Sequence, residues 1–209
     1  MNSETKPFAN RNDAGTRLAN LLLNQNDNPE IILALPRGGI PVALPISEKL
    51  GIPVQVLIVK KIGHPINSEY AIGALCEFGE LWSNNNITSS INKEFAKREA
   101  QQKIESLKKI FPERVQVHDI KSKHVLVVDD GAATGLTIQL AITTLKSLGA
   151  QKISIAIPVC PIHTYQRLNK IVDRMHVLLT PQSFTGVGAY YEEFPQLTDE
   201  EAVELLHTT

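Results

Sequence analysis

The sequence predicts an α/β protein built on a parallel twisted sheet with helices on both faces. The main observation is an order of strand, helix and strand that repeats from residue 125 to residue 179, which is typical of parallel sheets. The predicted strands are continuous apolar runs, which indicates that both of their faces are buried. A chain of 209 residues fits one domain, so we expect residues 1–209 to form a single unit.

The first part of the chain predicts a helix, a strand, a second helix and a second strand. Residues 13–23 (DAGTRLANLLL) begin with an acid and carry apolar residues at helical spacing. Residues 31–35 (IILAL) stop at a proline and predict a buried strand. Residues 41–51 predict a helix that ends at its glycine, and residues 54–59 (VQVLIV) predict one continuous buried strand.

The middle of the chain is less regular. Residues 60–82 begin as a polar loop and end in an alternating pattern that predicts a hairpin around Phe78 and Gly79. Residues 89–111 predict the longest helix. Its apolar face consists of Ile91, Phe95, Ala100, Ile104, Leu107 and Phe111.

The second half gives the clearest strand and helix order. Thr198 and Glu201 form a capping box that predicts a C-terminal helix over residues 198–206. The elements before it are a strand at 125–128, a helix at 137–148, a strand at 152–159, a helix at 162–168 and a strand at 175–179.

Composition argues against several classes of partner. The chain has 21 Lys and Arg against 22 Asp and Glu, a formal net charge of -1, so we expect no nucleic-acid partner. No apolar run approaches the roughly 20 residues that span a bilayer, and no signal-peptide core follows the first residues, so we expect no membrane partner. Cys76 and Cys160 lie in strand-like surroundings, which favours buried free thiols in a reducing cytoplasm. We therefore expect a cytoplasmic protein.

The stretch VLVVDDGAATGLT (125–137) carries the strongest functional signal. Asp129 and Asp130 follow a buried strand, at the sheet edge where ligands bind in parallel α/β proteins, and carboxylates there accept hydrogen bonds from hydroxyls. The small residues after them expose backbone amides and lead into a helix N-terminus, which predicts an anion site. Vicinal hydroxyls beside a phosphate describe ribose 5-phosphate. The residues predicted to bind it are Asp129, Asp130, Gly131, Ala132, Ala133, Thr134, Gly135 and Thr137.

Other interpretations of this stretch are a strand, turn and helix with a chance acidic turn, or a different phosphate motif. A nucleotide P-loop needs lysine where Leu136 stands, and a dinucleotide fingerprint needs a third glycine. An aspartyl-phosphate phosphatase has an Asp-x-Asp motif, whereas these two acids are adjacent.

The stretch resembles the phosphoribosyl-diphosphate loop of the type I phosphoribosyltransferase family: apolar residues, two acids, three variable positions, Thr, Gly, one variable position and Thr. The resemblance implies a pentosyl-class glycosyltransferase that moves the 5-phosphoribosyl group from phosphoribosyl diphosphate to a nitrogen nucleophile, a nucleobase or an amine, and releases pyrophosphate. It further implies Mg²⁺ held mainly through the donor, with Asp129 and Asp130 as additional ligands, and a homodimer. Asp129 and Asp130 would be the catalytic pair.

Two further segments resemble the pyrophosphate side of that family's site. In LPRGGIP (35–41), Arg37, Gly38 and Gly39 offer a guanidinium and accessible amides directly after the first strand. Lys60 and Lys61 end the second predicted strand. The alternatives are an ordinary Gly-Gly turn with a surface arginine, and two solvated lysines before a hairpin.

The resemblance also implies a flexible flap hairpin at about 61–83 and a small hood, from the N-terminal segment and residues 181–209. Glu69 in the flap is a candidate catalytic carboxylate, because Ala133 stands where the 6-oxopurine branch usually has an aspartate; a surface charge is the alternative. Phe184, Tyr190 and Tyr191 are candidates for the acceptor pocket, or else they fill the open end of the core.

A second class of function stays open beside the enzyme. The family also includes non-catalytic regulators that keep the fold and sense the donor or a nucleotide. A kinase-like or nucleotidase activity on phosphoribose would need catalytic groups that the sequence does not display. The acceptor itself is not specified by the sequence.

Overall fold

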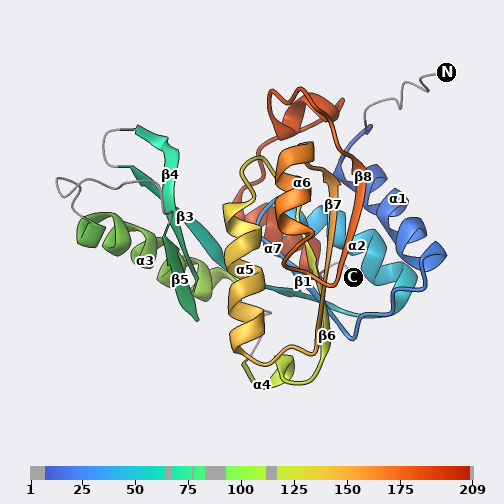
Figure 1. Cartoon of the computed structure of the whole chain (residues 1–209), viewed down its shortest axis with the longest axis horizontal. Helices are drawn as coiled ribbons and strands as arrows, with labels where there is room; N and C mark the ends of the chain where they lie inside the picture. Colours follow the sequence, from blue (N-terminus) through green and yellow to red (C-terminus); the bar gives the residue numbers. More distant parts are fainter. Residues whose placement is uncertain (1–7, 65–66, 77, 83–92, 112–116, 208–209) are drawn as a thin grey trace.

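The protein is described by a computed structural model that covers residues 8–64, 67–76, 78–82, 93–111 and 117–207 (Figure 1). Its centre is a five-stranded sheet in which every neighbouring pair of strands is parallel. This confirms the predicted α/β class. In spatial order the strands are β2 (Val54–Val56), β1 (Ile31–Ala34), β6 (His124–Val128), β7 (Lys152–Val159) and β8 (Arg174–Leu179).

Helices cover both faces of this sheet, because side chains alternate along each strand. Ile32 and Leu126 belong to a core that also includes residues of α1 (Arg11–Asn24) and α2 (Gly39–Leu50). Ile31 and Val125 belong to the opposite core, with residues of α5 (Leu136–Ser147) and α6 (Ile162–Leu168). Figure 1 shows α5 and α6 together on one side and α1 and α2 on the other.

A second, antiparallel sheet follows β2 and stands to one side of the first (Figure 1). Its strands are β3 (Val59–His64), β4 (Asn67–Cys76) and β5 (Gly79–Trp82). The antiparallel pairing of β4 with β5 on either side of Phe78 confirms the predicted hairpin.

Two predictions for this region were wrong. Residues 54–59 do not form one strand: β2 ends at Val56, which pairs with Ala34, and Val59 begins β3, where it pairs with Cys76 in the second sheet. Residues 60–64 do not form a loop either, since they belong to β3, and residues 65–66 lie outside the described ranges. The strand pairing shifts register on both sides of Gly63, so this glycine lies at an irregularity within a strand.

The remaining helices largely match the prediction. In α3 (Lys93–Ile110) and just after it, Ala100, Ile104, Leu107 and Phe111 are buried as expected, whereas residues 83–92 lie outside the described ranges. The short α4 (Val117–Ile120) was not predicted. No helix in the described ranges is long and apolar enough to cross a bilayer.

The C-terminal helix α7 (Asp199–His207) begins at the predicted capping box. Thr198 N donates to Glu201 Oε2 at 2.7 Å, and Glu201 N donates to Thr198 Oγ1 at 3.1 Å. The helix packs against α2 and α3. Its first residue, Asp199, lines one pocket together with Lys60 of β3.

A buried polar cluster occupies the edge of the parallel sheet where the strands begin. The Asp27 carboxylate is fully buried and accepts hydrogen bonds from Lys152 Nζ at 2.6 Å and His176 Nε2 at 2.8 Å. His124 Nε2 lies 2.8 Å from Ser154 Oγ and 3.7 Å from Asp27 Oδ1. The cluster joins the loop after α1 to the starts of β6, β7 and β8.

Because this cluster contains two buried histidines, we expect the free energy of unfolding of the protein to decrease as the pH falls below about 6.5. Burial lowers the pKa of both His124 and His176 from the ordinary value of 6.5, although Asp27 opposes the shift. Between the lowered pKa and 6.5 the unfolded chain binds more protons, so the free energy of unfolding decreases as the pH falls, by at most about 1.4 kcal/mol per pH unit for each histidine. Urea unfolding at pH 7.5 and 5.5 measures this. If the free energy of unfolding of a His176→Gln variant depends on pH as that of the wild type does, protonation of His176 does not cause the loss of stability.

Candidate functional site

The two segments predicted from separate motifs meet at the carboxyl edge of the sheet. Asp129 and Asp130 directly follow β6, and Asp130 N donates to Asp129 Oδ1 at 2.9 Å. A Cβ atom added to Gly38 would lie 2.0 Å from Asp130 Oδ2, and one added to Gly39 would lie 2.6 Å from the Val128 carbonyl oxygen. The Arg-Gly-Gly turn therefore lies against the acids, and glycine is needed at both positions. The Pro36–Arg37 peptide bond before this turn is cis.

The small-residue loop after the acids is supported from α6. Gly135 precedes α5 in the left-handed conformation, with φ of 69°, and a Cβ there would lie 2.9 Å from Thr164 Cγ2. Thr164 Oγ1 donates to the Ala133 carbonyl at 2.8 Å, and the Arg167 guanidinium donates to the Thr134 carbonyl.

These contacts leave the amides of the loop available. Ala132 N donates to the Val159 carbonyl at 3.0 Å. Among the described residues, the backbone N–H groups of Gly131, Ala133, Thr134 and Gly135 have no acceptor. Several such amides before the start of a twelve-residue helix form an arrangement that binds anions in other proteins. Thr137 lies in the first turn of α5 and is half-buried.

Arg11 is a site residue that the sequence analysis missed. Its Nε donates to Asp130 Oδ2 at 2.9 Å, a second guanidinium nitrogen donates to the Pro195 carbonyl at 2.9 Å, and the guanidinium lies 3.7 Å from the centre of the Phe194 ring. Burial raises the pKa of the Asp130 carboxyl, and the adjacent Arg11 opposes that shift. Arg11 thus orients the second acid and keeps a positive charge beside it. A single arginine 119 residues away gave no local signal of this contact.

The aromatic residues proposed for the acceptor pocket divide into two groups. Tyr191 is 6% exposed, packs between Phe8 and Phe194, and donates its hydroxyl to the Asp130 carbonyl at 2.6 Å. Burial raises the pKa of the Tyr191 hydroxyl far above its usual range. Phe184 and Tyr190 are less deeply placed and stack on each other with ring centres 5.7 Å apart.

The N-terminal segment lies beside these aromatics; that the two segments form a hood over an acceptor stays a prediction. Phe8 N donates to the Tyr190 carbonyl at 2.7 Å, and Glu192 N donates to the Phe8 carbonyl at 2.8 Å. Figure 1 shows the segments around residues 8 and 190 near each other above the sheet. Residues 1–7 lie outside the described ranges.

The basic residues proposed for the pyrophosphate are described only in part. Arg37 is exposed, and its Nε lies 3.8 Å from Asp199 Oδ1. Burial, together with the charges of Arg37 and Lys103, lowers the pKa of Lys60, while Asp199 opposes the shift. Lys61 lies on β3 and Glu69 on β4, but their side chains lie outside the described part of the structure.

Comparison with known proteins gives a consistent result. The family model described as phosphoribosyl transferase domain matches residues 7–192. Two proteins of Mycobacterium tuberculosis with phosphoribosyl transferase in their names are 34% identical over 206 residues, covering 96% of this chain and 46% of theirs. The chain thus spans about half the length of these relatives.

Solved structures support the same fold. The TT1426 protein of Thermus thermophilus is similar with a TM-score of 0.74 and 30% identity, over 96% of this chain and 97% of that one. A purine phosphoribosyltransferase of Pyrococcus horikoshii is similar in fold, with a TM-score of 0.50 and 22% identity over 92% of this chain and 98% of that one.

Proposed function

Because the chain belongs to the phosphoribosyl transferase domain family, we propose that it moves the 5-phosphoribosyl group from phosphoribosyl diphosphate to a nitrogen nucleophile and releases pyrophosphate. The observation that carries the proposal is the contact between Gly38 and Asp130. It sets a turn suited to pyrophosphate directly beside acids suited to ribose hydroxyls. The two ends of one donor molecule therefore have neighbouring sites on one sheet edge.

Different residues at this edge bind different parts of the donor. Asp129 and Asp130 accept hydrogen bonds from the ribose hydroxyls, and Arg11 keeps Asp130 in place. The available amides of the loop at 131–135, with Thr134 and Thr137, bind the 5-phosphate. Arg37, Gly38, Gly39, Lys60 and Lys61 bind the pyrophosphate. Fixing both ends orients the anomeric carbon, so positioning and electrostatic stabilisation supply most of the rate.

Asp129 and Asp130 also fit a role as ligands of Mg²⁺. They offer adjacent carboxylates on residues that are neither fully buried nor fully exposed, and Mg²⁺ in proteins is commonly held by one or two carboxylates plus substrate phosphates. Arg11 already occupies one oxygen of Asp130, which leaves most ligand positions to the donor. When bound, Mg²⁺ neutralises charge on the departing pyrophosphate.

For the acceptor we propose a nucleobase or an amine that contacts the stacked pair of Phe184 and Tyr190. Tyr191 is enclosed by Phe8 and Phe194, so we assign it to the support of Asp130 rather than to the acceptor surface. Ala133 is exposed and carries no acid for the acceptor. Glu69 remains our candidate carboxylate for proton transfer.

The test is pyrophosphate release from magnesium-loaded phosphoribosyl diphosphate across a panel of nucleobases and amines. We expect release with one acceptor and a loss of at least about tenfold in an Asp130→Asn variant, whose amide oxygen still accepts from Arg11 but carries no charge for the sugar. Thermal unfolding verifies that the variant is folded. Donor binding without release would favour a donor-sensing regulator, and the absence of both would contradict the assignment of the loop.

A further inference from the structure

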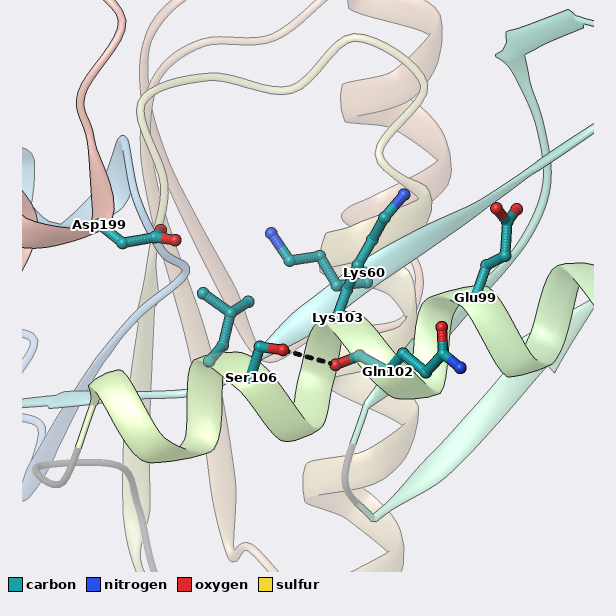
Figure 2. Close-up of a pocket in the computed structure, with 7 residues that line it drawn as sticks. Lys60, Glu99, Gln102, Lys103, Ser106 and Asp199 are labelled. Atoms are coloured by element: carbon teal, nitrogen blue, oxygen red, sulfur yellow. Dashed lines mark hydrogen bonds between the residues drawn. The ribbon is translucent and has the colours of Figure 1, made fainter.

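A pocket of about 300 Å³ opens between α3, β3 and the start of α7, next to the Arg-Gly-Gly turn. Figure 2 shows Asp199 on one side of it and the residues of α3 on the other. The polar residues that line it are Lys60, Glu99, Gln102, Lys103, Ser106 and Asp199.

The two lysines of the pocket come from different elements, β3 and α3. Within the described residues, no carboxylate lies within 4.0 Å of the ammonium of Lys60 or Lys103. The charges of Arg37 and Lys103 both act on Lys60 and, together with burial, lower its pKa. Three cations therefore gather around this pocket, Lys60 partly buried and Arg37 and Lys103 exposed, and together they favour an anionic ligand.

Asp199 is the acid of the pocket that pairs with one of these cations. Its Oδ1 lies 3.8 Å from Arg37 Nε, and the two side chains are 31% and 41% exposed. An exposed ion pair at this distance contributes little stability, so a phosphate can replace Asp199 at low cost. Glu99, four residues before Lys103 on α3, offsets part of the lysine charge. The remaining positive charge suits one phosphoryl group rather than a longer chain of them.

We propose that this pocket is the outer part of the pyrophosphate site, that Lys103 is an additional ligand of the diphosphate, and that Asp199 competes with the diphosphate for Arg37 and Lys60. The proposal rests on the proposed function, which places pyrophosphate at Arg37 and Lys60. The proposal adds Lys103 of α3 as a ligand of the diphosphate and Asp199 of α7 as an acid that competes with the diphosphate for the same cations. Asp199 thereby weakens retention of pyrophosphate after transfer, which favours its release.

Calorimetric titration with magnesium pyrophosphate tests the proposal in four proteins: wild type, Lys103→Gln, Asp199→Asn and Lys109→Gln. Lys109 is an exposed lysine of α3 outside the pocket and serves as the matched control. We expect Lys103→Gln to weaken binding about fivefold and Asp199→Asn to strengthen it about threefold, with the control unchanged. Ribose 5-phosphate should bind all four proteins equally, since it does not reach the pocket.

Opposite signs for the two substitutions cannot arise from a general loss of structure. Wild-type binding of pyrophosphate with no change in either Lys103→Gln or Asp199→Asn would overturn this inference and leave the proposed function standing. A wild-type protein that binds neither pyrophosphate nor phosphoribosyl diphosphate would instead overturn the proposed function.

Discussion

Replacing Gly38 with alanine is expected to weaken the binding of phosphoribosyl diphosphate about a hundredfold. The new Cβ would lie 2.0 Å from Asp130 Oδ2 and 2.5 Å from Asp130 Cγ. Asp130 cannot turn aside freely, because the same Oδ2 accepts from Arg11 Nε at 2.9 Å. Either the turn or the acid must move, and the two halves of the donor site then lose their relative position. Isothermal titration with magnesium-loaded donor measures the loss.

The control for this variant is Gly51→Ala at the end of α2. Gly51 has φ of 68°, and no described atom lies within 4 Å of the position that a Cβ would take. Alanine there costs backbone strain of about 1 kcal/mol without a collision. Its unfolding temperature should fall while donor affinity stays at the wild-type value. Donor affinity in Gly38→Ala within about threefold of wild type would show that the contact with Asp130 does not position the donor.

The parts of the site that are local in sequence could be predicted, and those that depend on distant partners could not. The acids and the small-residue loop lie within thirteen residues, so the strand, the turn and the helix start could all be recognised from spacing. The contact of Arg11 with Asp130 joins positions 119 residues apart. In the sequence Arg11 resembles any solvated arginine of a polar segment. The packing of α1 against α2 and β8, together with the pairing of Phe8 with Tyr190, brings it to the acid.

The strands show a similar limit. Continuous apolar runs identify buried strands because both faces of a parallel sheet are covered. An apolar run does not reveal where the chain leaves one sheet and enters another. The run of residues 54–59 is almost uniformly apolar, yet β2 ends at Val56 and β3 begins at Val59. The apolar composition of a segment indicates that its side chains are buried, but it does not indicate which strand provides its backbone hydrogen-bond partners. Gly63 was likewise assigned to a loop because a glycine at a register shift has the same local signature as one in a turn.

The acids at the two edges of the parallel sheet differ in burial and in their bonding partners. Asp129 and Asp130 remain partly accessible at the carboxyl edge, and we assign them to a ligand. Asp27 at the amino edge is fully buried and bonded to protein groups. Burial alone would raise the pKa of Asp27, but hydrogen bonds from Lys152, Ser154 and His176 lower it far below its usual range. Asp27 is therefore a charged structural group that bonds to β7 and β8 and lies 3.7 Å from His124 of β6.

Replacing Asp27 with asparagine is expected to lower the free energy of unfolding by about 3 kcal/mol at pH 7.5. Asparagine keeps the volume, so no cavity forms, but it removes the charge that Lys152 and His176 bind at 2.6 and 2.8 Å. The value lies at the low end for breaking a buried ion pair because the Lys152 side chain is 32% exposed and can turn to water. Urea unfolding followed by circular dichroism measures the change.

A second ion pair at the same edge provides the control. Glu30 and Lys123 are 2.8 Å apart, but their side chains are 46% and 48% exposed. Glu30→Gln should therefore destabilise the protein much less than Asp27→Asn, although it removes a carboxylate from a pair of similar length. Equal losses in Asp27→Asn and Glu30→Gln would mean that burial of Asp27 adds nothing to the pair. A larger loss in Asp27→Asn, with pyrophosphate binding unchanged in the folded protein, would separate the edge that stabilises the fold from the edge that binds the ligand.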